Sequence, residues 1–291
     1  MAEFLFNPTR LSFHIPHMLG GILLCGDKGE HGRGGNGDCI VVDGTTGLIG
    51  VADGTERSPQ ASRRFLKDTA AHLSDMGRRN ARPSHTDLLK AAQSVLDSFR
   101  YEDRTTFLCI LPASDGSVFY LSGGDSILMH IDTTTSRVLF RNRSNMGFAG
   151  RSPDLLDFGH LQVKRGERLL LATDGLWDIQ REDSQGFLQS ILSIVSAGPL
   201  HLVPTQLITA VHPAFCTTEA RSYDDFSLVL IDPLQIRPFS YRVLLGGTDK
   251  DSEHSYQRRC KSREFPDRDC ALPEDGHSLW IFPDCLDEYS C

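Results

Sequence analysis

The sequence predicts an α+β fold: a four-layer αββα sandwich, in which two antiparallel β-sheets pack face to face and helix pairs flank them. Two observations predict it. Short runs rich in Val, Ile, Leu and Phe follow one another at hairpin distance, which favours antiparallel pairing over a parallel βαβ array. Two blocks of helical periodicity interrupt these runs. At 291 residues the chain is long enough to bury a sizeable core.

The expected strands are short apolar runs bounded by Gly, Asp, Ser or Pro, the residues that typically border strands. Turn residues such as Ala113-Ser114-Asp115-Gly116 separate two of them at the distance of a hairpin. In chain order the expected strands are Leu11–Ile15, Gly21–Cys25, Cys39–Val42, Leu48–Ala52, Thr106–Leu111, Val118–Leu121, Ile127–Ile131, Val138–Phe140, Leu169–Ala172 and Phe226–Ile231.

The expected helices fall in two blocks. In the first, Ser58-Pro59 indicates an N-cap followed by a proline in the first turn, and Ser84 or Thr86 begins a second helix with one apolar face. In the second block, Phe187–Val195 has helical spacing, and a weaker stretch around Leu207–Val211 follows Pro204. Each block therefore supplies one helix pair of the predicted sandwich.

The composition changes after the last expected strand. Beyond residue 232, 19 of 59 residues are charged, about 32% against 23% for the whole chain. Apart from Tyr241–Leu245 and Leu279–Phe282 this region shows little periodicity. We therefore divide the chain into a body, 1–232, and a charged C-terminal extension, 233–291. The extension is expected to be dispensable, with its apolar patches docking on the body or on a partner protein.

Charge and hydropathy exclude several classes of protein. The formal net charge of −8 argues against a nucleic-acid binder, which needs a surplus of Lys and Arg, and suits a protein that holds cations on carboxylates. No run approaches the ~20 apolar residues of a membrane span. The run Met18–Cys25 lacks the features of a secretory leader. We therefore expect a cytoplasmic protein with reduced thiols and no membrane association.

Aspartates stand at the ends of three apolar runs. Asp53-Gly54 and Asp174-Gly175 each follow such a run, and Asp224-Asp225 directly precede another. One Asp-Gly step is usually only a turn. Three such acids on one side of a sheet would repel one another, and a cation is the natural partner that keeps them ionised. Oxygen ligands without a nearby His or Cys set favour Mg²⁺ or Mn²⁺ over Zn²⁺.

An ordered set of short motifs resembles the metal-dependent type 2C serine/threonine protein phosphatases, in a short form typical of bacteria. Each motif is weak alone, but the order over residues 33–232 is specific, most of all the Ala-Thr-Asp-Gly-Leu-Trp-Asp run. The motifs are Asn36-Gly37-Asp38, Gly50-Val51-Ala52-Asp53-Gly54, Thr105-Thr106, Gly124-Asp125-Ser126, Ala172-Thr173-Asp174-Gly175-Leu176-Trp177-Asp178 and Asp224-Asp225-Phe226-Ser227.

The resemblance implies a role for each matching residue. Asp53 matches a carboxylate that bridges two divalent cations, Mn²⁺ or Mg²⁺, and the Gly54 carbonyl matches a ligand of one of them. The remaining matches are Asp174 and Asp224 as ligands of the other cation, Asp38 as an acid that holds water, Arg33 as a phosphate-binding residue, and Asp125 and Asp178 as a third, weaker metal site. The implied reaction is hydrolysis of phosphoserine or phosphothreonine in a protein substrate by an activated water.

Three departures from the family pattern bear on chemistry. Thr55 stands where many members have a His that protonates the leaving oxygen, a role worth ~10²–10⁴-fold in rate. Gly37 stands where members often have Glu, and Arg104 where a glycine is common. His31, near Arg33, is the alternative proton donor that we consider.

Other interpretations compete with an active phosphatase. A catalytically weak or silent module of the same fold is one, although a sandwich core does not itself require acids at Asp53, Asp174 and Asp224. An aspartyl-phosphate enzyme of the haloacid dehalogenase kind would need Asp-x-Asp at one of the two Asp-Gly-Thr runs, which begin at Asp43 and Asp53. Val41 and Val51, two positions before these aspartates, exclude it. Arg33 could instead be a solvated loop residue without a role in binding. Asp125 and Asp178 could instead only cap turns. A zinc site in the extension is disfavoured, because the spacings of its Cys and His residues match no standard finger.

Overall fold

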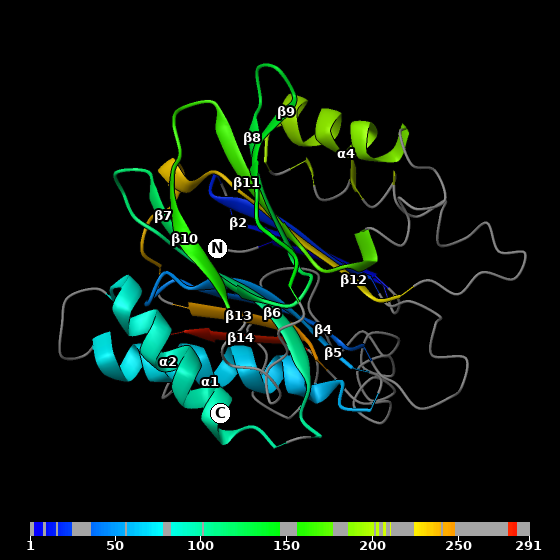
Figure 1. Cartoon of the computed structure of the whole chain (residues 1–291). Helices are drawn as coiled ribbons and strands as arrows, with labels where there is room; N and C mark the ends of the chain where they lie inside the picture. Colours follow the sequence, from blue (N-terminus) through cyan, green and yellow to red (C-terminus); the bar gives the residue numbers. More distant parts are fainter. Residues whose placement is uncertain are drawn as a thin grey trace, which may run out of the picture.

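The computed structural model describes 3–7, 10–15, 17–24, 36–55, 57–77, 83–100, 102–145, 156–176, 186–200, 202–203, 206–207, 210, 224–239, 241–247 and 279–283. These residues form two antiparallel sheets packed face to face, with helices on both outer faces (Figure 1). The α+β sandwich expected from the sequence is therefore confirmed. Each expected strand overlaps a strand of the structure.

The first sheet, sheet A, joins strands from distant parts of the chain. Its order is β1-β2-β3-β12-β11-β8-β9, so strands near residues 20, 170 and 230 lie side by side at its centre. The strands are β1 (Glu3–Asn7), β2 (Arg10–Ile15), β3 (Leu19–Leu24), β8 (Ile127–Asp132), β9 (Arg137–Arg141), β11 (Glu167–Ala172) and β12 (Phe226–Ile231).

The second sheet, sheet B, has the order β10-β7-β6-β5-β4-β13-β14. β4, β5, β6 and β7 are neighbours in chain order, with two helices inserted between β5 and β6, while β13 joins from the C-terminal region and pairs with β4. The strands are β4 (Asp38–Asp43), β5 (Ile49–Gly54), β6 (Thr105–Pro112), β7 (Ser117–Gly123), β10 (Asp157–Gln162), β13 (Tyr241–Gly246) and β14 (Leu279–Pro283).

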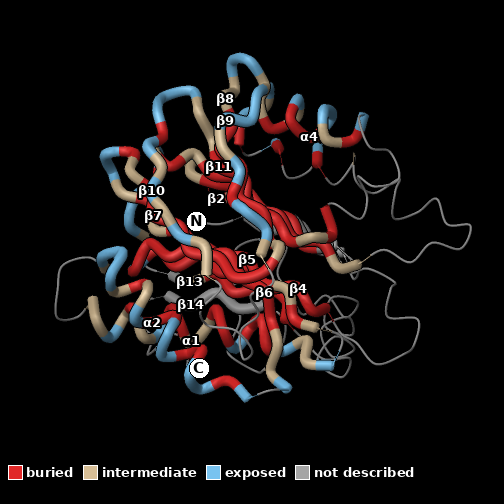
Figure 2. Tube along the Cα trace, in the orientation of Figure 1, coloured by how far each residue is buried: buried red, intermediate tan, exposed pale blue. Residues whose placement is uncertain are grey.

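The central strands are apolar on both faces because both faces are covered. In β4, Ile40 and Val42 point into the layer between the sheets, whereas Cys39 and Val41 point toward the helices. Three buried layers result: one between the sheets, one between sheet A and its helix, and one between sheet B and its helix pair. Figure 2 shows the buried strands at the centre and exposed residues on the helices and hairpin tips.

The helices begin close to the expected positions. Helix α1 (Gln60–Gly77) follows Ser58-Pro59, and α2 (His85–Ser98) begins after Ser84, whose side chain forms a capping box with Asp87. Both helices cover sheet B, and α4 (Gly186–Ala197) covers sheet A (Figure 1). None of the helices in the described part is long and apolar enough to span a bilayer.

Two strands of the described C-terminal region extend sheet B beyond the expected boundary. The predicted body ended at residue 232, but β13 pairs with β4 from Arg242 opposite Asp43 to Gly246 opposite Cys39. The boundary at 232 therefore falls between strands of one sandwich, and 233–291 is not wholly an appendage. The sequence did not indicate the pairing, because the partner of β13 lies about 200 residues earlier in the chain.

An ion pair joins β13 to the rest of sheet B. Arg242 donates from Nε and Nη2 to Asp43 Oδ2 at 3.0 and 2.7 Å, and its Nη2 also donates to Ser74 Oγ of α1 at 3.1 Å. Asp43 is buried, so removing Arg242 would leave a buried carboxylate without its cation.

Truncation tests this boundary. Ending the chain after Pro238 removes β13, whereas ending it after Thr248 keeps β13 and removes only later residues. Val243, Leu244 and Leu245 are wholly buried, and each such side chain contributes ~1.5–3 kcal/mol against a typical total stability of ~5–15 kcal/mol. We expect the shorter chain to be insoluble or to unfold without cooperativity, and the longer one to unfold cooperatively, as followed by circular dichroism. A chain ending at Pro238 that melts within a few degrees of full length would contradict this assignment.

Candidate active site

The candidate site begins where β4 and β5 of sheet B meet their loops. The antiparallel register places Asp38, the first residue of β4, opposite Asp53 near the end of β5. On its other side Asp53 stands opposite Thr106 of β6. Two acids 15 positions apart in the sequence are therefore neighbours across one ladder.

Sheet A brings further acids to the same end of the sandwich. Asp174 follows β11, and Asp224-Asp225 precede β12; because Ala172 stands opposite Leu228, these chain ends lie together. Two hydrogen bonds join the sheets at this point. The Gly37 N–H donates to Asp225 Oδ2 at 2.6 Å, and Thr173 Oγ1 donates to Asp38 Oδ2 at 2.6 Å.

The carboxylates repel one another strongly. Burial raises the pKa of Asp38 well above its ordinary value, and Asp53, Asp225 and Asp174 raise it further. Burial likewise raises the pKa of Asp53, with added repulsion from Asp174, Asp224, Asp225 and Asp125. The strongest charges acting on these two acids are thus other carboxylates, and a cation at this point would relieve the repulsion.

Thr173 fixes the position of Asp38 from the opposite sheet. Its hydroxyl donates to the Asp38 carboxylate and accepts the Ser227 N–H at 2.9 Å. The Thr173 N–H donates to the Ser227 carbonyl at 3.1 Å, which continues the ladder beyond β11 and β12. The side chain of Asp38 is therefore held by a residue whose own backbone is fixed in sheet A.

A close backbone approach explains the glycine at position 37. The Gly54 N–H donates to the Gly37 carbonyl at 2.9 Å. A Cβ atom on Gly37 would lie 2.5 Å from the Gly54 carbonyl oxygen and 3.4 Å from Asp53 Oδ1. A side chain at this position would push the two loops apart. The backbone packing beside Asp53 therefore leaves no room for the Glu that the family often has at position 37.

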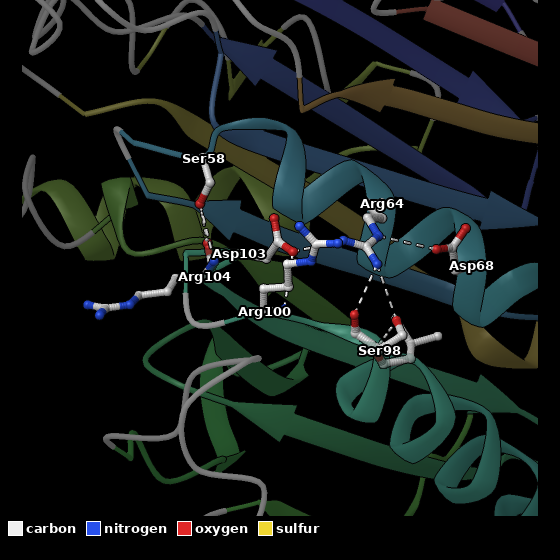
Figure 3. A network of polar contacts seen from close by, with 8 residues as sticks. Ser58, Arg64, Asp68, Ser98, Arg100, Asp103 and Arg104 are labelled. Atoms are coloured by element: carbon white, nitrogen blue, oxygen red, sulfur yellow. Dashed lines mark hydrogen bonds and ion pairs between the residues drawn. The ribbon is translucent and has the colours of Figure 1, made fainter.

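Thr55 is tied into the turn that follows Asp53-Gly54. Its N–H donates to the Arg104 carbonyl at 3.2 Å, and its Oγ1 is 3.1 Å from Ser58 Oγ. Ser58 Oγ accepts the Arg104 N–H at 3.1 Å (Figure 3). This turn is thereby fastened to the start of β6, and the Thr55 hydroxyl is engaged with Ser58.

A polar network holds α1 against the segment that leads into β6. Figure 3 shows Arg64 of α1 between Asp68, Asp103 and Ser98. Its Nη1 is 2.8 Å from Asp103 Oδ2, and its guanidinium lies 4.7 Å from the centre of the Phe99 ring. Asp103 of this network directly precedes Arg104, whose backbone is hydrogen-bonded to Thr55 and Ser58.

The family model described as Stage II sporulation protein E (SpoIIE) matches residues 48–233, which cover β5 through β12. That span is well over half of the chain. The chain belongs to the SpoIIE family.

Two solved structures similar to this SpoIIE-family chain are described as serine/threonine phosphatases. The PPM Ser-Thr phosphatase MsPP from Mycobacterium smegmatis, in complex with cacodylate, has a TM-score of 0.55 and 19% identity over 74% of this chain and 97% of its own. The serine/threonine phosphatase PstP/Ppp of Mycobacterium tuberculosis has a TM-score of 0.54 and 15% identity over 74% and 98%.

RsbX in complex with magnesium has a TM-score of 0.51 and 14% identity over 79% of this chain and 98% of its own. Among curated proteins none matches the chain. At these identities the solved structures show a shared fold, and together with the family match they confirm the predicted resemblance to type 2C phosphatases.

The structure gathers four of the predicted site residues of this SpoIIE-family chain. Asp38, Asp53, Asp174 and Asp224 lie at one end of the sandwich, and Asp125 is close enough to raise the pKa of Asp53. Arg33, Asp178 and His31 lie outside the described residues, as do the Cys and His residues of the extension.

Sequence reasoning missed three contributors to the site. Thr173 and Asp225 lie within recognised motifs, so their motif membership could have indicated them. Ser62 of α1, whose Oγ donates to the Gly37 carbonyl at 2.5 Å, has no sequence signature. Its role follows only from the packing of α1 on β4.

The chemistry of the donors fits divalent cations. Carboxylates and the Gly54 carbonyl are hard oxygen ligands, and the mutual repulsion of the carboxylates is a cost that a cation removes. As placed, no three His, Cys, Asp or Glu side chains in the described ranges converge into a ready-made metal site.

Thermal unfolding of Asp53→Asn tests the repulsion. The raised pKa means that the charged form of Asp53 is disfavoured in the folded chain, so removing the charge stabilises the metal-free protein at neutral pH. We expect Tm in EDTA to rise by at least ~2–4 °C, the effect of ~1 kcal/mol in a domain of this size. As the pH falls through the raised pKa the parent becomes protonated, and the difference should shrink.

Asp115→Asn is the matched control. Ser117 hydrogen bonds lower the pKa of this exposed carboxyl, so its removal should not raise Tm. Addition of Mn²⁺ should stabilise the parent more than Asp53→Asn. An Asp53→Asn variant that is less stable in EDTA and gains as much from Mn²⁺ would contradict the assignment.

Proposed function

We propose that the chain hydrolyses phosphoserine and phosphothreonine in proteins and that the reaction requires two divalent cations, Mn²⁺ or Mg²⁺. The observation that carries the proposal is the position of acids from both sheets at one buried end, where neighbouring carboxylates raise the pKa of Asp38 and Asp53. Family membership supports the class of reaction. A neighbour, the catalytic domain of PstP, was solved in complex with two manganese ions.

Each acid has a proposed role. Asp53 would bridge both cations, and the Gly54 carbonyl would bind one of them. Asp174 and Asp224 would complete the other site, while Asp125 and Asp178 would contribute to a third, weaker one. Support for the bridging role comes from the electrostatics of Asp53, whose pKa is raised by burial and by Asp174, Asp224, Asp225 and Asp125.

The chain's own residues orient the reactants. When bound, divalent cations lower the pKa of water and neutralise phosphoryl oxygens. The Asp38 carboxylate, which Thr173 holds, would accept a hydrogen bond from the attacking water and take up its proton. Arg33 is proposed to bind the phosphate. Because attack by water needs no nucleophilic side chain, no covalent phosphoenzyme forms.

A weakly active or silent module is the second candidate. The observation that favours it is Thr55, which replaces a frequent proton donor of the family and is hydrogen-bonded within its own turn. Such a module would bind metal and a phosphoprotein without efficient turnover. Metal binding without hydrolysis of any phosphopeptide would select it over the enzyme.

Replacement of Asp174 tests the metal centre. Asp174→Asn removes one charged ligand while keeping the shape of the side chain, and we expect kcat on a phosphothreonine peptide to fall by at least ~10²-fold with the fold retained. EDTA should abolish the parent's activity, and Mn²⁺ or Mg²⁺ should restore it. Asp132→Asn, on the exposed β8–β9 turn, is the control and should keep normal turnover. Full activity in EDTA, or in Asp174→Asn, would rule out the proposed centre.

Leaving-group dependence tests the role of position 55. A nitrophenolate leaves without protonation, whereas a serine alkoxide needs a proton, so an added general acid helps only the latter. We expect Thr55→His to raise turnover of a phosphopeptide more than turnover of p-nitrophenyl phosphate. The control is Thr55→Val, which loses the contact with Ser58 but adds no acid. Equal effects of Thr55→His on both substrates would show that another group, for which His31 is our candidate, already donates the proton.

A further inference from the structure

The end of β13 lies directly against the start of β4, inside the candidate site. Gly246 stands opposite Cys39, and the Gly247 N–H donates to the Asp38 carbonyl at 2.7 Å. The last hydrogen bond between these strands is therefore made by Asp38 itself. Its backbone is held by Gly247 on one side and by the β5 ladder, at Asp53, on the other.

Positions 246 and 247 require glycine. Both have positive φ angles, +78° and +63°, in the left-handed region that side chains disfavour. A Cβ atom on Gly246 would lie 2.0 Å from the Asp38 carbonyl oxygen, and one on Gly247 would lie 2.4 Å from Arg63 Cβ. The chain therefore turns in direct contact with the backbone of Asp38 and with α1.

Helix α1 holds this turn with a buried arginine side chain. Arg63 is buried, and its Nη1 donates to the Gly246 carbonyl at 2.7 Å. The preceding residue, Ser62, donates to the Gly37 carbonyl at 2.5 Å. Consecutive residues of α1 thus bind the backbone next to Asp38 and the C-terminal turn that pairs with it.

We infer that Arg63, Gly246 and Gly247 are positioning residues of the proposed metal centre. The C-terminal strand β13 and the turn after it would then be needed for full metal affinity. This inference rests on the proposed function. The three residues touch neither substrate nor cation; they act by fixing the backbone of Asp38, whose carboxylate Thr173 fixes from the other sheet. Residues that orient a metal site in this indirect way typically alter metal affinity by ~10–100-fold when replaced.

The decisive comparison is between two glycines with the same local strain. Gly247→Ala puts a methyl group at positive φ against Arg63. Gly116→Ala does the same at φ +82° in the β6–β7 turn, where the Cβ atom would lie 2.4 Å from the Val163 carbonyl oxygen. Gly116 lies at the opposite end of β6 from Thr106, the residue opposite Asp53. Both variants of the full chain should lose thermal stability.

Only the variant beside Asp38 should lose metal affinity. We expect Gly247→Ala to bind Mn²⁺ at least ~10-fold more weakly by calorimetry, and to need correspondingly more Mn²⁺ for half-maximal hydrolysis of p-nitrophenyl phosphate. Gly116→Ala should keep the parent's Mn²⁺ affinity. Loss of stability without a change in Mn²⁺ affinity in Gly247→Ala would overturn the positioning role.

A second pair of variants covers the case in which Gly247→Ala fails to fold. Arg63→Met removes the guanidinium that donates to the Gly246 carbonyl. Arg63→Lys keeps a positive charge and should retain part of the Mn²⁺ affinity that Arg63→Met loses. Arg168→Met is the control, because Arg168 donates to the Gly198 carbonyl at 2.9 Å beside α4. Weaker Mn²⁺ binding in Arg63→Met but not in Arg168→Met supports the inference. An Arg63→Met variant that binds Mn²⁺ as tightly as the parent, or no more weakly than Arg168→Met, overturns it. A parent chain that binds no Mn²⁺ would instead overturn the proposed function, and the inference with it.

Discussion

Like charges held together at a buried end are the constraint on which this structure depends. Asp38 and Asp53 face each other across the β4–β5 ladder, and acids from the loops of sheet A raise the pKa of both. A free chain would let these groups separate into water. The folded sandwich prevents this, because each acid is attached to a strand or loop whose backbone hydrogen bonds fix its place. The repulsion is therefore stored in the fold, where a cation can relieve it.

Burial of apolar side chains in three layers offsets the repulsion between these carboxylates. The central strands bury side chains on both faces, so that the ends of β4, β5, β11 and β12 stay fixed although their carboxylates repel. This division of labour is general for binding sites on sheets: rigid strands supply position, and the loops at their ends supply chemistry. It also explains why the polar contacts Thr173–Asp38 and Gly37–Asp225, which join the two sheets, occur where the acids meet.

The described C-terminal region belongs to this frame, because β13 and β14 are both strands of sheet B. Its strand β13 adds buried side chains to two of the three layers, and Arg242 neutralises Asp43, a buried acid at the far end of β4 from Asp38. The strand thus contacts both ends of β4. An extension that looks like an appendage by composition is, in its first part, fastened to the strand that carries a proposed catalytic acid.

The sequence by itself determined the sandwich, ten of its strands, the helix starts at Ser58 and Ser84, and the acids that gather at one end. These features are local, because apolar runs, helix caps and Asp-Gly steps can each be recognised from a few consecutive residues. It did not determine the edge strand β10, whose alternating exposure leaves Phe158 57% exposed and gives no apolar run. Nor did it determine the pairing of β13 with β4 or the roles of Thr173, Ser62 and Arg63. Those depend on contacts between residues 25 to about 200 positions apart. Only the tertiary structure decides them, because the free energy of such contacts is gained when the layers pack and leaves no pattern along the chain.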